Sequence, residues 1–150
     1  MVEIARALVD EMVAHSGADL PNEACGVVHA VDGVATSVHR VTNASASPYR
    51  YEMAPLEQLK LEERRDTEGE TLFAIYHSHV ASEARPSQTD VNMAFWPPGE
   101  TNGNQMYPET LYIVVSLADE TTPDRVVRAF HIVPADAYLD CLEEVAVEVV

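Results

Sequence analysis

Basic residues are scarce in this sequence. Lys and Arg together number 9 against 25 Asp and Glu, which gives the 150 residues a formal net charge of -16 at pH 7. A negative field of this size repels phosphate backbones and anionic lipid surfaces, so we expect no nucleic acid and no membrane among the partners. The charge itself indicates no particular substrate.

Long apolar stretches are also missing. No run approaches the roughly 18 apolar residues of a membrane span, and the first residues, which include Glu3, lack the apolar core of a signal peptide. These absences predict a cytoplasmic protein. No internal repeat or linker is visible, and a content of 47% hydrophobic and 23% charged residues is ordinary for a globular protein. We therefore expect one domain that covers residues 1–150.

Cysteine is rare as well. Cys25 and Cys141 lie far apart in the sequence and form no Cys-x-x-Cys pair. Reduced, buried thiols are the expectation for such cysteines in a reducing compartment. Because Cys25 follows Glu23 by two residues, a role for Cys25 as nucleophile or metal ligand stays open as the alternative.

The periodicity of the apolar residues predicts a mixed α/β fold. Apolar residues at helical spacing indicate helices, and short β-branched runs indicate strands, two of which are joined by the turn signal Asp32-Gly33. The predicted helices are 3–15, 56–68, a turn or two at 91–95, and 135–142. The predicted strands are 24–30, 34–41, an edge strand at 49–53, 72–76, 111–116 and 126–133, with a turn region at 119–125 and a terminal strand or interface tail at 143–150.

Residues 96–108 contain too many Pro, Gly and Asn residues for a regular element, and they form a loop of unusual length for a compact domain. We expect this loop to border the active site or a homodimer contact, with Trp96 and Tyr107 as anchors. A surface insertion with both aromatic side chains tucked in is the alternative.

Two histidines follow the apolar run 72–76 and are candidate metal ligands. His77 and His79 flank Ser78, so in a continued strand both imidazoles project from the same face. Alone, a His-x-His pair is more often a surface or core pair than a ligand set. The remaining histidines have no partner at ligand spacing and are predicted to be structural or exposed: His15, His29, His39 and His131.

The segment from Ser87 to Asp90 is typical of a helix start. Its Ser-x-x-Asp spacing fits a capping box, in which the Ser side chain caps the helix and the acid bonds back. After the loop with Pro86, Asp90 turns back toward the strand end and supplies a third, oxygen ligand. Two imidazoles and one carboxylate leave a coordination position open for water, as catalytic zinc requires. Both interpretations are compatible, because a capped helix start is a rigid mount for a ligand.

The sequence His77-x-His79, seven intervening residues, Ser87, two more residues and Asp90 resembles the JAMM motif of the MPN-domain metallopeptidases without a gap. The family also has an upstream glutamate, and Glu23, within Asn-Glu-Ala-Cys-Gly-Val, is similar to it. Without that motif, an acid at a strand start would be taken for a solvated loop residue. The resemblance covers most of the chain and is greatest to the small, stand-alone bacterial type, the CysO-cysteine peptidase type.

This resemblance implies a single MPN domain (JAB1/MPN-like, cytidine-deaminase-like), a curved mixed β-sheet flanked by helices. It implies Zn²⁺ on His77, His79 and Asp90, with Glu23 as general acid and base and Ser87 as a donor to the substrate carbonyl oxygen. The implied activity is hydrolysis of the amide bond after the Gly-Gly tail of a ubiquitin-like sulfur carrier protein. Two alternatives stay open, a non-catalytic MPN module that binds partners and a zinc hydrolase of a small-molecule amide.

Overall fold

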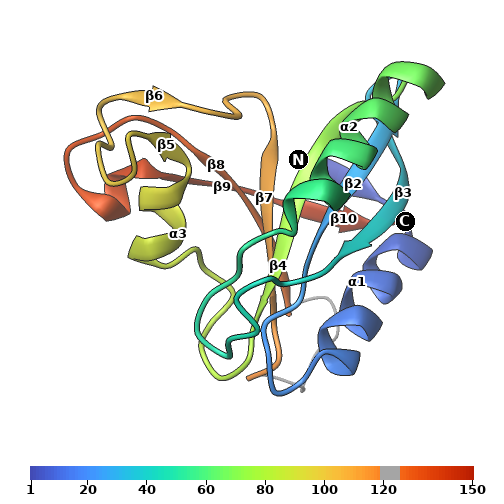
Figure 1. The fold of residues 1–150 in the computed structure, drawn as a ribbon, viewed down its shortest axis with the longest axis horizontal. Coiled ribbons are helices and arrows are strands. Elements are labelled where there is room, and N and C mark those ends of the chain that lie inside the picture. The colour runs from blue at the N-terminus through green and yellow to red at the C-terminus, as the bar shows by residue number, and fades with distance from the viewer. Residues whose placement is uncertain (119–125) are drawn as a thin grey trace.

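The structure, a computed structural model, describes residues 1–118 and 126–150. Its centre is a six-stranded sheet in the order β3-β2-β4-β7-β8-β9, in which β4 and β7 run parallel and the other neighbours antiparallel (Figure 1). The helices are α1 (Arg6–Ala18), α2 (Pro55–Glu68), α3 (Gln88–Met93) and a 3-10 turn (Tyr138–Cys141). The strands are β1 (Val2–Ile4), β2 (Cys25–Val31), β3 (Val34–Val41), β4 (Thr71–His79), β5 (Phe95–Trp96), β6 (Asn104–Gln105), β7 (Leu111–Ser116), β8 (Val127–Ile132), β9 (Leu142–Val145) and β10 (Val147–Val149).

The central sheet separates two apolar cores, because successive side chains of a strand point to opposite faces. On one face, Ala74 of β4 packs in a cluster with Met12 of α1. On the other face, Ile75 belongs to a cluster with Val91 of α3, against which Leu61 of α2 is also packed. Figure 1 shows α1 well apart from α3, with β4 running between them. Within the described ranges, no helix is both long and apolar enough to cross a membrane.

Strand β4 carries the two candidate histidines into the interior. The predicted strand 72–76 is confirmed and is longer than expected, because its hydrogen bonding to β2 and β7 continues to its end. Every residue from Ala74 to His79 is buried. Since side chains alternate, His77 and His79 share the face of Ile75, while Ser78 shares the face of Ala74.

The first predicted helix begins too early. Val2–Ile4 is a strand paired in parallel with β10, with Val2 opposite Val147, and α1 then continues through Gly17 to Ala18. The apolar residues of this segment fit both a helix and a short strand, and only the distant partner at the C-terminus decides between them. The same pairing confirms the terminal strand expected within residues 143–150, which forms β9 and β10.

Other predicted elements differ in extent. Residues 49–53 form no strand, and only an isolated bridge joins Met53 to Asn43. The loop 96–108 was predicted to lack regular structure, yet it contains the two-residue strand β6, paired with β5. The helix predicted at 135–142 is reduced to the 3-10 turn. The turn region at 119–125 lies outside the described residues.

Gly26 packs directly against the ring of Tyr76, and we predict that Gly26→Ala destabilises the protein by about 2–3 kcal/mol. A Cβ atom at Gly26 would lie 2.4 Å from Tyr76 Cε1 and 2.5 Å from the His39 carbonyl oxygen, which belongs to rigid backbone. Urea unfolding measures the loss. Gly17→Ala is the matched control, because nothing lies within 4 Å of its added Cβ and alanine favours the helix. Equal midpoints for Gly26→Ala and the wild type would contradict the prediction.

Candidate metal centre

The end of β4 brings two imidazole nitrogens together. His77 is 1% exposed and His79 is 6% exposed, and their Nε2 atoms lie 3.1 Å apart. Both side chains come from one face of the strand, as their spacing predicted. Two lone pairs held this close repel each other unless a cation or a proton lies between them.

Asp90 completes this pair from α3. Its Oδ2 lies 3.0 Å from His77 Nε2 and 3.2 Å from His79 Nε2. The predicted capping box is also present: Ser87 N donates to Asp90 Oδ2 at 2.8 Å, and Ser87 Oγ accepts from Asp90 N at 3.1 Å. The cap fixes the aspartate, so one side chain serves the helix start and the cluster together.

The three ligand atoms fit a tetrahedral metal ion. Bonds of about 2.0–2.1 Å at tetrahedral angles place neighbouring ligand atoms about 3.3–3.4 Å apart. The observed separations are 3.0, 3.1 and 3.2 Å. His77, His79 and Asp90 can therefore hold a metal ion, and three protein ligands leave a position of a tetrahedral ion open.

Further contacts orient the two histidine rings. His79 Nδ1 lies 2.7 Å from the Glu83 carbonyl oxygen. A carbonyl oxygen can only accept, so Nδ1 carries the hydrogen and the neutral ring turns the Nε2 lone pair toward the centre. The ring of Tyr51 stacks on His77 with centroids 4.6 Å apart and planes inclined by 24°.

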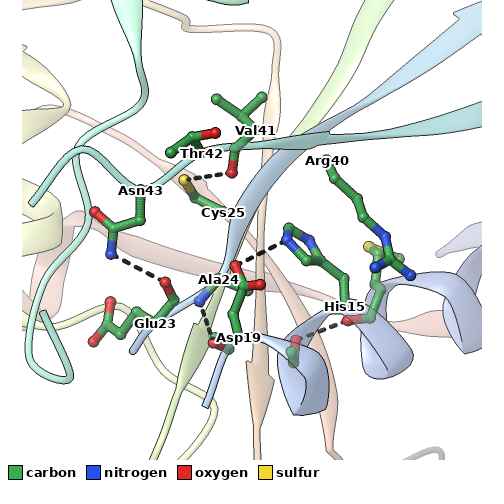
Figure 2. A network of polar contacts seen from close by, with 12 residues as sticks. His15, Asp19, Glu23, Ala24, Cys25, Arg40, Val41, Thr42 and Asn43 are labelled. Atoms are coloured by element: carbon green, nitrogen blue, oxygen red, sulfur yellow. Dashed lines mark hydrogen bonds and ion pairs between the residues drawn. The ribbon is translucent and has the colours of Figure 1, made fainter. Parts of the chain in front are cut away.

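Glu23 lies beside the histidines because the pairing of β2 with β4 continues past Cys25, which is opposite His77. Ala24 N donates to Ser78 Oγ at 2.8 Å, and Ser78 N donates to the Ala24 carbonyl at 3.0 Å. This register places Glu23 opposite His79, with its side chain on the face of the two imidazoles. In Figure 2 the Glu23 carboxylate points away from the neighbouring His15 and Asp19.

The carboxylate of Glu23 is buried, at 3% exposure. Burial raises the pKa of Glu23 to about 7, and the negative charge of Asp90 adds to the rise, while the two histidines oppose it. Burial also acts to raise the pKa of Asp90, but His77, His79 and the Ser87 N–H outweigh it and hold that pKa far below its ordinary value. The two carboxyl groups therefore differ in character, since Asp90 is a fixed anion and Glu23 can exchange a proton near neutral pH.

Two buried side-chain atoms lack a hydrogen-bond partner among the described residues, Glu23 Oε1 and His77 Nδ1. Buried polar atoms without partners are rare in folded proteins. Both atoms belong to this cluster, and the unpartnered oxygen of Glu23 is a ready acceptor for a small polar molecule such as water.

Cys25 lies on the same strand face as the cluster but takes no part in it. Its Sγ donates to the Val41 carbonyl at 3.5 Å, and burial raises the pKa of the thiol to about 12. A neutral thiol with a backbone partner is a poor nucleophile and a poor metal ligand. The interpretation of Cys25 as a buried thiol is supported over the alternative.

The other histidines are held by partners outside the cluster. His15 Nδ1 lies 2.6 Å from the Tyr76 hydroxyl, and His29 Nδ1 lies 3.1 Å from Glu70 Oε1. His39 Nε2 lies 2.8 Å from Ser37 Oγ. The structural role predicted for these three residues is thus confirmed, and His131 is half-buried on β8.

Comparison with known proteins assigns the family. The family of prokaryotic homologues of the JAB domain matches residues 5–132, a range that contains the whole cluster. The CysO-cysteine peptidase of Mycobacterium tuberculosis is 39% identical over 114 residues, which are 75% of this chain and 70% of that protein. The chain belongs to the JAMM/MPN+ metallopeptidase family.

Other JAMM relatives and solved structures agree with this assignment. The desampylase of Haloferax volcanii is 36% identical over 96 residues, which are 59% of this chain and 68% of that protein. A solution structure from Desulfitobacterium hafniense matches 99% of this chain and 92% of its own, with a TM-score of 0.78 and 29% identity. A JAB1/MPN domain protein from Archaeoglobus fulgidus matches 99% of both chains with a TM-score of 0.57 and 19% identity, which supports the fold alone. The MPN fold with a mixed sheet is thereby confirmed.

A groove of about 350 Å³ opens beside Asp90 of this JAMM chain. Tyr51, Met93, Met106 and Tyr107 contribute to its lining. The loop 96–108 therefore borders the site through its second half. Trp96 is 64% exposed, so the alternative with both aromatic side chains tucked in is wrong for this residue.

Sequence reasoning missed two contributors to the centre. Tyr51 was predicted only as part of an edge strand, since nothing in its own neighbourhood points to His77. Glu83 acts through its backbone carbonyl, so its side chain leaves no signal. A search for aromatic residues in the loop after β3 could have raised Tyr51 as a candidate, whereas no pattern would have raised Glu83.

Proposed function

We propose that this chain is a zinc peptidase that hydrolyses the amide bond after the C-terminal Gly-Gly of a ubiquitin-like sulfur carrier protein, with release of cysteine or a short peptide. One observation carries the hydrolytic part: the buried, unpartnered Oε1 of Glu23 accompanies the three converging ligands on one face of the sheet. The substrate class comes from the names of relatives, a CysO-cysteine peptidase, a desampylase and a probable TtuB-protein conjugate cleaving protease.

In this proposal, His77, His79 and Asp90 hold Zn²⁺, which is suited to two nitrogen ligands and one oxygen ligand. Bound zinc would polarise a water molecule and lower its pKa toward ~7. Glu23 would accept a proton from the attacking water and later give it to the amine that leaves the substrate. The environment of Glu23 favours this double role, because its pKa is raised to about 7 by burial.

Ser87 is proposed to donate a hydrogen bond to the substrate carbonyl oxygen as negative charge develops there. Its Oγ already accepts from Asp90 N, and no acceptor for its hydroxyl hydrogen is found within residues 1–118 and 126–150. The hydroxyl can therefore donate outward without breaking the helix cap. A nucleophilic role for Ser87 lacks a base, because both nearby imidazoles belong to the ligand set.

We predict that Ser87→Ala lowers kcat by about 100-fold, the loss expected for one donor to a developing oxyanion. The variant also loses a helix cap, which costs about 1 kcal/mol of stability. Ser87→Thr keeps both the hydroxyl and the cap, so it separates the two effects in steady-state kinetics and thermal unfolding. A Ser87→Ala enzyme with wild-type kcat would remove Ser87 from the mechanism.

The groove beside Asp90 is the proposed path of the substrate tail. It joins the ligand Asp90 to the lining residues Met93, Met106 and Tyr107, and Tyr51 lies where the groove meets His77. Gly-Gly has no side chains, so main-chain hydrogen bonds would hold such an extended tail.

The deciding experiment incubates zinc-loaded protein with a carrier protein that ends in Gly-Gly-Cys and measures the product by mass spectrometry. The expected product is the carrier ending in Gly-Gly, lighter by one cysteine residue. An uncleaved carrier would exclude this substrate. Cleavage of a small acyl-cysteine amide without the carrier would favour the small-amide hydrolase, and binding of the carrier without cleavage would favour the non-catalytic module.

The cytoplasmic location, the homodimer and the extent of the domain over residues 1–150 stay predictions. The proposed activity requires the cytoplasmic location, because a sulfur carrier in cysteine or sulfur-metabolite synthesis is an intracellular substrate. Gel filtration with light scattering tests the homodimer.

A further inference from the structure

The side chain of Asn43 uses its full hydrogen-bonding capacity on the backbone of three segments. Its Nδ2 donates to the Glu23 carbonyl at 3.0 Å and to the Arg50 carbonyl at 3.1 Å. Its Oδ1 accepts from Ser45 N and Glu52 N, both at 3.0 Å. A primary amide has two hydrogens and two lone pairs, so each has one partner. Figure 2 shows the contact of Asn43 with Glu23.

Two of these segments carry residues of the centre. One contact holds the backbone of Glu23 itself, and two others hold Arg50 and Glu52, the neighbours of Tyr51 on either side. Tyr51 in turn stacks on the ligand His77. Asn43 thus connects the carboxylate on one side of the cluster with the aromatic ring that covers one of its ligands.

We infer that Asn43 is a positioning residue, which sets the Glu23 carboxylate and the Tyr51 ring relative to His77. This inference rests on the proposed function for its kinetic consequences. Asn43 acts through Glu23 and Tyr51 and needs no contact of its own with a substrate.

Few other contacts fix the backbone of Glu23 and of the segment that carries Tyr51. Glu23 precedes the first residue of β2, and its other backbone contact is N–H donation to the Ser47 carbonyl at 2.8 Å. Its Oε1 has no partner, so the position of the carboxylate follows from the backbone and from packing. The segment that carries Tyr51 is no regular strand. The isolated bridge between Asn43 and Met53, with hydrogen bonds from Ala44 N to the Glu52 carbonyl at 2.7 Å and from Ala54 N to the Thr42 carbonyl at 3.1 Å, connects its backbone to the end of β3.

Asn43→Asp tests the inference with little change of shape. The new oxygen replaces Nδ2 and faces the carbonyl oxygens of Glu23 and Arg50, while the acceptor for Ser45 N and Glu52 N remains. We expect kcat for the carrier conjugate to fall about 100-fold, the effect of displacing a reacting group by about 1 Å. KM and the zinc content should stay within threefold of the wild type, because the zinc ligands come from β4 and α3.

A second readout does not depend on activity. The stacked Tyr51 ring should shift the proton resonances of the His77 ring upfield in the zinc-loaded protein, and Asn43→Asp should reduce this shift. Asn43→Ala removes the same bonds without repulsion and should change kcat and the shift in the same direction. Ser47→Ala is the matched control, since it removes a side-chain contact in the same loop, from Tyr49 N to Ser47 Oγ at 3.1 Å, and keeps the Ser47 backbone carbonyl that accepts from Glu23 N.

The outcomes separate the inference from the proposed function. If the wild type does not cleave the conjugate, the proposed function fails, and the His77 resonances still test the placement of Tyr51. The inference would be overturned if both Asn43 variants kept the wild-type kcat and showed the His77 resonances at their wild-type positions. An equal loss of kcat in Ser47→Ala would also overturn it, because general loosening of the loop would then explain the result.

Discussion

Glu23→Gln is expected to lower kcat for the carrier conjugate by about 1000-fold, within the range for loss of a general acid and base. The amide keeps the size of the side chain but cannot accept a proton from water. Zinc should stay bound in full amount, because Glu23 is not one of the three converging ligands. Steady-state kinetics and metal analysis of the purified variant measure the two quantities.

The same substitution is expected to leave stability unchanged or to raise it. Glu23 is 3% exposed and its Oε1 has no partner, and a neutral amide is easier to bury than a carboxylate. Replacement of a residue that stabilises the fold would instead lower the stability. Glu63→Gln, on the exposed face of α2, removes the same charge at a residue that lines neither the cluster nor the groove, and it should change neither activity nor stability. Retention of more than a tenth of wild-type kcat in Glu23→Gln would exclude Glu23 as the base.

The convergence of the three candidate ligands was predictable because local rules determine the directions of their side chains. Alternation along a strand sets His77 and His79 on one face, and the Ser-x-x-Asp spacing starts a helix that points Asp90 back at them. The loop between the strand and the helix only had to be short enough for the two ends to meet. These rules act over a few residues, so a sequence displays them directly.

The parts that sequence reasoning missed depend on partners far away in the chain. Ile4 fits a helical pattern with Leu8, and only pairing with Val149 makes it a strand residue. Tyr51 reaches His77 through a loop that is held by hydrogen bonds of Asn43 and by backbone hydrogen bonds to the end of β3. An irregular segment has no periodicity from which its direction could be read, so its contribution becomes visible only in three dimensions.

Asp90→Asn is expected to abolish both zinc binding and turnover, the largest effect predicted for this protein. The amide can still accept from Ser87 N, so the helix start should persist, but the anionic ligand between the two imidazoles is lost. We expect the zinc dissociation constant to rise at least 100-fold, as removal of a ligand exceeds the effect of its supporting contacts. Competition with a chromogenic chelator measures the constant, and Asp66→Asn on exposed α2 is the matched control.

Removal of the metal from the wild type should have the same effect as Asp90→Asn, namely loss of turnover. A ligand present at 100 times its dissociation constant stabilises the folded state by about 2.7 kcal/mol, and for a chain of this size each kcal/mol shifts Tm by roughly 2–4 °C. A chelator should therefore lower the Tm of the wild type by about 5–10 °C, and added zinc should restore Tm and activity together. Asp90→Asn should show the low Tm under both conditions, because it cannot bind the ion that distinguishes them. An equal response of Asp90→Asn and the wild type to zinc would show that the stabilising ion binds elsewhere, and the ligand set would then be wrong.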